Sequence, residues 1–250
     1  MTSSFAVELD GIDVERGGRL ALSEVSFAIE PGTLTAVVGP NGAGKSSMFG
    51  VIAGRLNPTS GTVRTSGSIA EVLQSTALDE NLPLTVEDAV WMGRYADRGL
   101  FRRMRSSDRA IVEAAMEATG VAELRRRTIS ELSGGQRQRA LLAQGIVQEA
   151  PILILDEPAT GLDVSSQQDL FGVIKNEVER GVTVLMATHD LRDAAEADNV
   201  LVLACECVCC APPVDAFADP AVTALMSTSP SWAIDVDDNA PSLTLESRTS

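Results

Sequence analysis

The sequence predicts an α/β fold built on a mostly parallel β-sheet. The first observation is a short apolar run at residues 34–38, which leads into the glycine-rich loop GPNGAGKS and then into a segment that can begin a helix. The second is a set of further apolar runs at residues 152–155, 182–186 and 200–203, typical of strands covered on both faces. Strand, loop and helix in this order indicate a P-loop NTPase core of the RecA-like kind.

The residues ahead of this core predict an N-terminal antiparallel β subdomain. Residues 6–9 and 25–29 both alternate in the manner of strands, and Gly17-Gly18 supplies a turn between them. Residues 58–63 indicate another turn that leads into a strand, and residues 68–73 indicate the next strand.

The glycine-rich loop matches the phosphate-binding motif G-x-x-x-x-G-K-[ST]. Its glycines allow backbone N–H groups to point inward around phosphate oxygens, and the following helix N-terminus adds free donors and a favourable dipole. Lys45 can reach the β- and γ-phosphates, and the Ser46 hydroxyl can ligate Mg²⁺. The expected nucleotide-binding residues of the loop are Gly39, Pro40, Asn41, Gly42, Ala43, Gly44, Lys45, Ser46 and Ser47.

Two carboxylates follow the apolar run at residues 152–155. Ligands in open α/β sheets bind at the carboxyl ends of the strands, so Asp156 and Glu157 are expected beside the phosphate loop. Asp156 is placed to hold Mg²⁺ through water. Glu157 can orient and polarise the attacking water.

The middle of the chain predicts helices. Thr85 and Asp88 resemble a capping box at the start of one helix. Ser107 is the expected N-cap of a second helix over residues 108–119, which Gly120 ends. A third helix is predicted over residues 137–147.

The segment LSGGQ precedes that third helix. Ser133 is an N-cap candidate, and Gly134 and Gly135 expose backbone donors, so this helix end is a second anion-binding site. The same five residues, Leu132, Ser133, Gly134, Gly135 and Gln136, match the signature of ABC-type ATPases, and the resemblance extends over about residues 6–220. Gln74 resembles the Q-loop glutamine, Asp163 resembles the D-loop aspartate, and His189 resembles the H-switch.

The resemblance implies how these residues combine into an ABC ATPase fold that binds ATP and Mg²⁺. Two copies would pair head to tail, with ATP held between the phosphate loop of one and the signature of the other. Asp163 would link the two sites. The implied catalytic residues are Glu157, His189 and Gln74, and the implied Mg²⁺ residues are Ser46, Asp156 and Gln74.

The segments at residues 81–95 and 99–103 are similar to those of the manganese/zinc uptake branch of bacterial ABC importers. This implies an ATPase subunit that works with separate transmembrane permease subunits and an extracytoplasmic solute-binding protein. An exporter subunit and a soluble, non-transport ABC ATPase remain alternatives. No run of 18 apolar residues and no signal peptide are visible, so we expect a cytoplasmic protein, peripheral on the inner face of the membrane.

Composition limits the remaining possibilities. The net charge of −15 over 250 residues lacks the basic footprint of a nucleic-acid-binding protein. We expect one ATPase domain over residues 1–225, with a helical subdomain inserted at about residues 80–150. Residues 226–250 are rich in Ser, Thr, Pro and Asp and are expected to be disordered.

Several features depart from the family pattern or leave two interpretations open. Arg16 stands where relatives place an aromatic residue against adenine, so the chain is expected to stack a guanidinium on the base or hold it weakly, with a relaxed ATP-versus-GTP preference. Gly145 is expected to soften the helix after the signature.

Two clusters each leave two interpretations open. An arginine run forms either a solvated face or a contact with a membrane-bound partner or anionic lipid; it comprises Arg94, Arg98, Arg102, Arg103 and Arg105. A cysteine cluster forms either buried thiols in a hairpin or a soft-metal or redox site, with Cys205, Cys207 and Cys209 on one face of a strand; Cys210 completes it.

Overall fold

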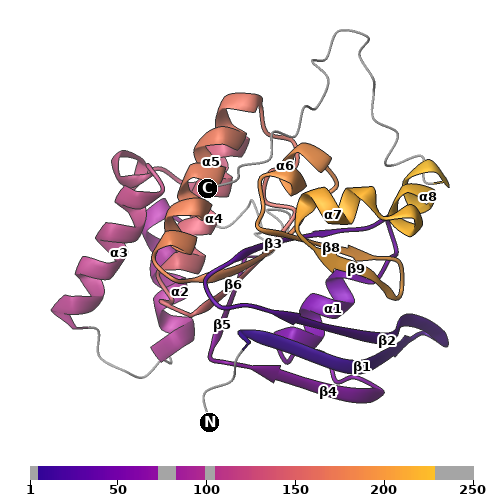
Figure 1. Ribbon diagram of the computed structural model, residues 1–250. Helices are drawn as coiled ribbons and strands as arrows, with labels where there is room; N and C mark the ends of the chain where they lie inside the picture. The colour runs from indigo at the N-terminus through magenta and orange to yellow at the C-terminus, as the bar shows by residue number, and fades with distance from the viewer. Residues whose placement is uncertain (1–4, 73–82, 99–104, 229–250) are drawn as a thin grey trace, which may run out of the picture.

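The computed structural model describes residues 5–72, 83–98 and 105–228. It contains two sheets with one helix between them (Figure 1). The smaller sheet is antiparallel, in the order β2-β1-β4. Its strands are β1 (Val7–Arg16), β2 (Arg19–Ile29) and β4 (Ser60–Thr65). The predicted antiparallel β subdomain is therefore confirmed.

The larger sheet has the order β5-β6-β7-β3-β8-β9 and is parallel except for β9. Its strands are β3 (Leu34–Val38), β5 (Ile69–Val72), β6 (Ile152–Asp156), β7 (Thr183–Ala187), β8 (Asn199–Leu203) and β9 (Cys207–Ala211). β3 and β7 are buried at every position, because helices or the second sheet cover both faces. The predicted mostly parallel sheet is confirmed.

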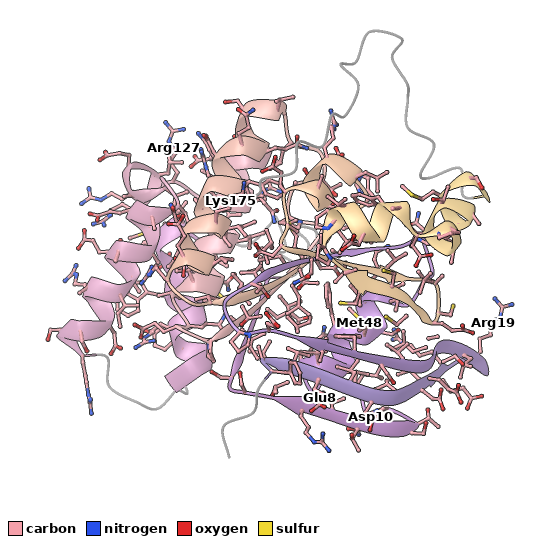
Figure 2. The ribbon with its side chains drawn as sticks, in the orientation of Figure 1. Glu8, Asp10, Arg19, Met48, Arg127 and Lys175 are labelled. Carbon is pink, nitrogen blue, oxygen red and sulfur yellow. The ribbon has the colours of Figure 1, made fainter. Side chains whose placement is uncertain are left out.

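Helix α1 (Lys45–Ile52) lies between the two sheets (Figure 1). Met48 and Phe49 pack into one hydrophobic cluster with residues of β1, β2 and one face of the large sheet. Figure 2 shows Met48 in this interior position. The helix that begins at the phosphate loop is thus held on two sides by apolar packing, which fixes its N-terminus.

The opposite face of the large sheet is covered by helices from the second half of the chain. They are α4 (Gly134–Ile146), α5 (Val164–Glu179), α6 (Leu191–Ala195), α7 (Pro213–Ala218) and α8 (Pro220–Thr228). A second hydrophobic cluster joins their buried residues to β3, β5, β6, β7 and β8. None of the described helices combines the length and apolar character that a membrane span requires.

A third cluster lies among α2 (Val86–Arg98), α3 (Ser106–Ala118), two short 3₁₀ turns at Ala122–Leu124 and Ile129–Glu131, and α4. The predicted capping box of α2 is present: the Asp88 amide donates to Thr85 Oγ1 at 3.1 Å, and the Thr85 amide donates to Asp88 Oδ2 at 3.1 Å. The boundaries expected for the domain and its helical insertion stay a prediction.

The expectation that Ser107 caps α3 is wrong. The N-cap is Arg105, whose backbone amide donates to Asp108 Oδ2 at 2.7 Å. The same buried carboxylate accepts a hydrogen bond from Arg94 Nε at 3.0 Å, so an interaction with another helix decides where α3 begins. Gly120 ends the helical segment in the left-handed region, as expected.

Arg94 also corrects the interpretation of the arginine run. Its side chain is only 3% exposed, and its guanidinium contacts Asp108, Glu149 and the Val147 carbonyl. Arg94 therefore joins α2 to the start of α3 and the end of α4 and is not part of a solvated face. Arg105 is exposed. Arg98, Arg102 and Arg103 lie outside the residues whose side chains are described.

Gly145 packs more tightly than expected. A Cβ placed on it would lie 2.5 Å from Val72 Cγ2 and 3.1 Å from Leu153 Cδ1. This glycine allows α4 to approach β5 and β6, so its role is close packing and the expected softening has no separate support.

The cysteine strand carries a β-bulge that the sequence did not reveal. Cys207, Cys209 and Cys210 pair with Leu203, Val202 and Leu201, which leaves Val208 as the extra residue. The bulge places Cys207 and Cys210 on one face and Cys209 on the other, so the expected alternation is wrong. No group of three His, Cys, Asp or Glu side chains suited to a metal occurs among the described residues. The C-terminal tail was predicted to be disordered from residue 226, but residues 226–228 belong to α8. The rest of that tail lies outside the described residues.

Candidate nucleotide-binding site

The glycine-rich loop connects β3 to α1 and lines a cavity of about 260 Å³. The residues around this cavity are Ala21, Asn41, Gly42, Ala43, Gly44, Lys45, Ser46, Ser47, Asp156 and Glu157. Gly44, the N-cap of α1, has φ +98°, and a Cβ on it would lie 2.5 Å from the Ala21 carbonyl oxygen. Glycine is therefore required both by the turn and by the close approach of β2.

Lys45 stands at the first position of α1 and is only 8% exposed. Its Nζ donates to the carbonyl oxygen of Gly39 at 2.6 Å and to that of Pro40 at 3.4 Å. Burial lowers the pKa of this ammonium, while the nearby Glu157 and Asp156 carboxylates raise it. The buried Lys45 ammonium therefore lies within the loop, against the backbone carbonyls of its first two residues.

Ser46 and Asp156 meet across the cavity. The Ser46 hydroxyl donates to Asp156 Oδ2 at 3.4 Å. Burial raises the pKa of the Asp156 carboxyl, and the neighbouring Glu157 adds to the effect. A hydroxyl and a carboxylate are hard oxygen donors of the kind that Mg²⁺ prefers, so this pair fits the expected metal.

Glu157 and His189 lie at the ends of neighbouring strands. Glu157 follows β6 at φ +50°, and its amide donates to the Ala187 carbonyl at the end of β7. His189 Nδ1 lies 4.0 Å from Glu157 Oε2, and the Thr160 hydroxyl donates to the same carboxylate oxygen at 3.3 Å. The imidazole is 55% exposed, and His189 is not among the residues that line the cavity.

The β8–β9 turn contacts and supports the phosphate loop. No feature of the sequence predicted this contact. The Cys205 amide donates to the Ala43 carbonyl at 2.9 Å, and its carbonyl accepts the Ser23 amide at 2.7 Å. Cys205 adopts φ +65°, which no sequence signal indicated. The turn therefore ties the phosphate loop to β2.

The signature residues lie at the start of α4 and do not join the cavity lining within the described part of the chain. Ser133 caps the helix as predicted: its Oγ accepts the Gln136 amide at 3.3 Å, and its own amide donates to Gln136 Oε1 at 3.1 Å. Leu132 is buried beneath this end. Gly134 and Gly135 form the first turn.

Asp163 lies close to this helix end. It caps α5 by accepting the Ser166 amide at 2.9 Å and the Ser166 hydroxyl at 3.1 Å, and these hydrogen bonds lower the pKa of its carboxyl. A Cβ on Gly135 would lie 2.7 Å from Ser166 Oγ, so the signature and the Asp163 turn are in contact.

Arg16, the residue expected against the purine base, does not line the cavity. Arg16 ends β1 directly opposite Arg19, at the tip of the β1–β2 hairpin, and is not part of the lining. Figure 2 shows Arg19 pointing away from the body of the protein. Neither guanidinium has an ion-pair partner among residues 5–72, 83–98 and 105–228. Gln74 lies outside these residues.

The chain is similar to proteins of the ABC transporter family, whose pattern it matches over residues 22–160. It is 40% identical over 200 residues to the manganese transport system ATP-binding protein MntA of Synechocystis sp., covering 76% of this chain and 77% of that protein. It is 37% identical over 221 residues to the zinc import ATP-binding protein ZnuC of Alcanivorax borkumensis, covering 86% and 81%.

Solved structures have the same fold. A metal-chelate type ABC transporter in an inward-facing conformation superposes with a TM-score of 0.82 at 26% identity, covering 90% of this chain and 89% of that one. The ATP-binding cassette MJ0796, solved as a dimer bound to ADP and Pi, superposes with a TM-score of 0.70 at 23% identity, covering 83% and 98%.

Proposed function

The chain belongs to the ABC transporter family and is an ATPase that drives transport, and from this premise we propose that it energises the uptake of a divalent metal ion or its chelate. The observation that carries the catalytic part is the meeting of Lys45, Ser46, Asp156 and Glu157 around one cavity. The metal cargo is supported by the relatives that transport manganese and zinc. This subunit would not contact the cargo.

In the proposed reaction, the loop amides and Lys45 bind the β- and γ-phosphates of ATP. Ser46 and Asp156, with Gln74 from the Q-loop, would hold Mg²⁺, which when bound would supply charge neutralisation at the phosphates. Glu157 accepts a proton from the attacking water as its oxygen bonds to the γ-phosphorus. The bond to the β–γ bridging oxygen breaks, and ADP leaves with the electron pair. His189 steadies the γ-phosphate.

The cavity supplies only half of the site in this proposal. Ser133, Gly135 and the neighbouring backbone amides of a second copy would close over ATP, with Asp163 linking the two sites. The position of the signature at the start of α4 supports this arrangement, because Ser133 and Gly134 are exposed. Closure on ATP and reopening after hydrolysis would drive the transport partner.

The proposed partners are separate transmembrane permease subunits and an extracytoplasmic solute-binding protein, with this chain on the inner face of the membrane. Arg16 would contact the purine base, which the unpaired state of its guanidinium among the described residues supports. An exporter subunit and a soluble, non-transport ATPase are the competing functions.

Glu157→Gln tests the enzymatic part. We expect kcat for ATP hydrolysis to fall at least about 100-fold, as for removal of a general base, while ATP binding persists and a dimer accumulates in light scattering. Glu179→Gln, an exposed change on α5, is the matched control and should behave as wild type. Hydrolysis near the wild-type rate in Glu157→Gln would show that Glu157 is not the general base.

Deleting the gene in its own organism tests the direction and the cargo. Lower cellular manganese or zinc, restored by the wild-type chain but not by Glu157→Gln, supports import. Higher content supports export. Unchanged content of both metals contradicts the proposed cargo and favours a different substrate or a non-transport role.

A further inference from the structure

A hydrogen-bonded chain lies behind His189, in residues that the proposed reaction does not use. The Asp190 amide donates to Thr188 Oγ1 at 3.1 Å, and the Thr188 hydroxyl donates to Asp193 Oδ2 at 3.1 Å. Thr188 is 5% exposed and Asp193 is 9% exposed. The hydroxyl therefore links the residue after His189 to the first turn of α6.

The same segment is attached to both other parts of the catalytic centre. The Thr188 amide donates to the Val37 carbonyl in β3 at 3.1 Å, just before the phosphate loop. The Ala187 carbonyl accepts the Glu157 amide at 3.2 Å. Movement of Thr188 would consequently alter His189 relative to Glu157 and to the loop that begins at Gly39.

Asp193 has a fixed environment. Burial raises the pKa of its carboxyl, and the nearby Asp190 carboxylate adds to this, whereas the Thr188 hydrogen bond, Arg192 and His189 favour ionisation. Asp190 is itself held by Arg192, whose amide donates to Asp190 Oδ1 at 2.8 Å. A buried carboxylate with one side-chain donor is costly unless that donor is well placed, which favours a single geometry for the Thr188 hydroxyl.

We propose that Asp193 is a positioning residue that, through the Thr188 hydroxyl, sets the orientation of the His189 backbone and hence the reach of its imidazole toward the γ-phosphate. Asp193 itself contacts neither nucleotide nor water in this role. The inference rests on the proposed role of His189 as the γ-phosphate contact. It assigns a positioning role to two side chains behind the site, Thr188 after β7 and Asp193 in α6.

Kinetics give the first test, with variants that separate positioning from folding. Asp193→Ala and Thr188→Val should each lower kcat about 10-fold and leave the KM for ATP within about two-fold of wild type. Asp193→Asn and Thr188→Ser should retain most activity, because an amide oxygen can accept the bond and serine keeps the hydroxyl. The double variant Asp193→Ala/Thr188→Val should be no slower than the slower single variant, because both changes remove one interaction.

Asp198→Ala is the matched control. Asp198 also ties a loop to β3, by accepting the Leu34 amide at 2.8 Å, but at the far end of the strand. Loss of this hydrogen bond in Asp198→Ala should lower the thermal midpoint of unfolding and leave kcat unchanged. An equal fall in kcat in Asp198→Ala and Asp193→Ala would reduce the effect to general destabilisation and overturn the proposal, as would wild-type kcat in Asp193→Ala.

The second test is independent of hydrolysis. His189 is the only histidine in the chain, so untagged protein gives a single imidazole Cε1–Hε1 signal in NMR. We expect this signal to shift in Asp193→Ala and Thr188→Val but not in Asp198→Ala. An unmoved signal in the first two variants overturns the positioning role. A wild-type protein that does not hydrolyse ATP would instead contradict the proposed function, and the NMR comparison would still decide the role of Asp193.

Discussion

The Ser46 hydroxyl lies 3.4 Å from an Asp156 carboxylate oxygen, although 110 residues separate the two in the chain. The contact exists because β3 and β6 both flank β7 in the parallel sheet and end at the same edge. Ser46 lies in the first turn of the helix after β3, and Asp156 ends β6. The proposed magnesium-binding pair is thus brought together by the order of the strands in the sheet.

The buried Asp156 carboxylate, which is proposed to hold Mg²⁺, should reduce the stability of the folded protein at neutral pH. Its pKa is raised above the ordinary value of 3.8, so the folded protein holds this proton more tightly than the unfolded chain does. That contribution is complete below about pH 3.8, and it is lost as the pH rises through the folded-state pKa. We expect Asp156→Asn to raise the thermal midpoint at pH 7 by about 2 °C in the absence of Mg²⁺, with a smaller gain toward pH 4.

Calorimetry across this pH range checks the prediction. The exposed Asp10→Asn on β1 is the control and should change the midpoint little. Asp156→Asn should also weaken the effect of Mg²⁺ on nucleotide binding. A lower midpoint at pH 7 than in the wild type would contradict the proposed cost of burying this charge.

The buried ion pair of Arg94 and Asp108 should be important for the stability of the helical region. Asp108→Ala would leave the Arg94 guanidinium, 3% exposed, without its most buried partner. We expect the free energy of unfolding to fall by about 3 kcal/mol, measured with urea. Glu113→Gln removes the partner of Arg125 in an exposed pair and should lower the free energy of unfolding far less than Asp108→Ala does. Similar losses in both variants would mean that burial does not decide the effect.

Two glycines should respond oppositely to alanine. In α4, the Gly145→Ala methyl would meet Val72 and Leu153, so we expect a loss of about 1–3 kcal/mol from overpacking. In α5, nothing lies within 4 Å of the corresponding position at Gly172, so Gly172→Ala should gain about 0.5–1 kcal/mol. Urea unfolding of the two variants gives the comparison. A gain in Gly145→Ala would show that α4 can move away from the sheet.

Arg16 should contribute to the binding of ATP and GTP alike. We expect similar affinities for ATP and GTP in Glu157→Gln protein, since a guanidinium can stack on either purine. Arg16→Ala should weaken both about 3- to 10-fold, whereas Arg19→Ala on the opposite strand should have a smaller effect. Equilibrium binding of fluorescent nucleotides measures this. A strong preference for ATP that persists in Arg16→Ala would refute the role of Arg16.

Much of the fold could be predicted because its signals are local. The apolar runs that became β3, β6, β7 and β8 have the composition of doubly covered strands, and the capping residues Thr85 and Ser133 act within one turn of their helices. The start of α3 was misplaced because Asp108 is fixed by Arg94 of another helix. The cysteine faces were misassigned because a bulge depends on pairing between strands.

The sequence by itself determined the family, the phosphate loop and the chemical character of each proposed catalytic group, since these depend on residue type and short spacing. Only the tertiary structure decided that Arg94 is buried, that Cys205 braces the phosphate loop, and that Asp193 stands behind the loop of His189. These relationships depend on which distant segments the sheet order brings together. Residue spacing along the chain carries no record of that order, because hydrogen bonds and packing between elements fix it.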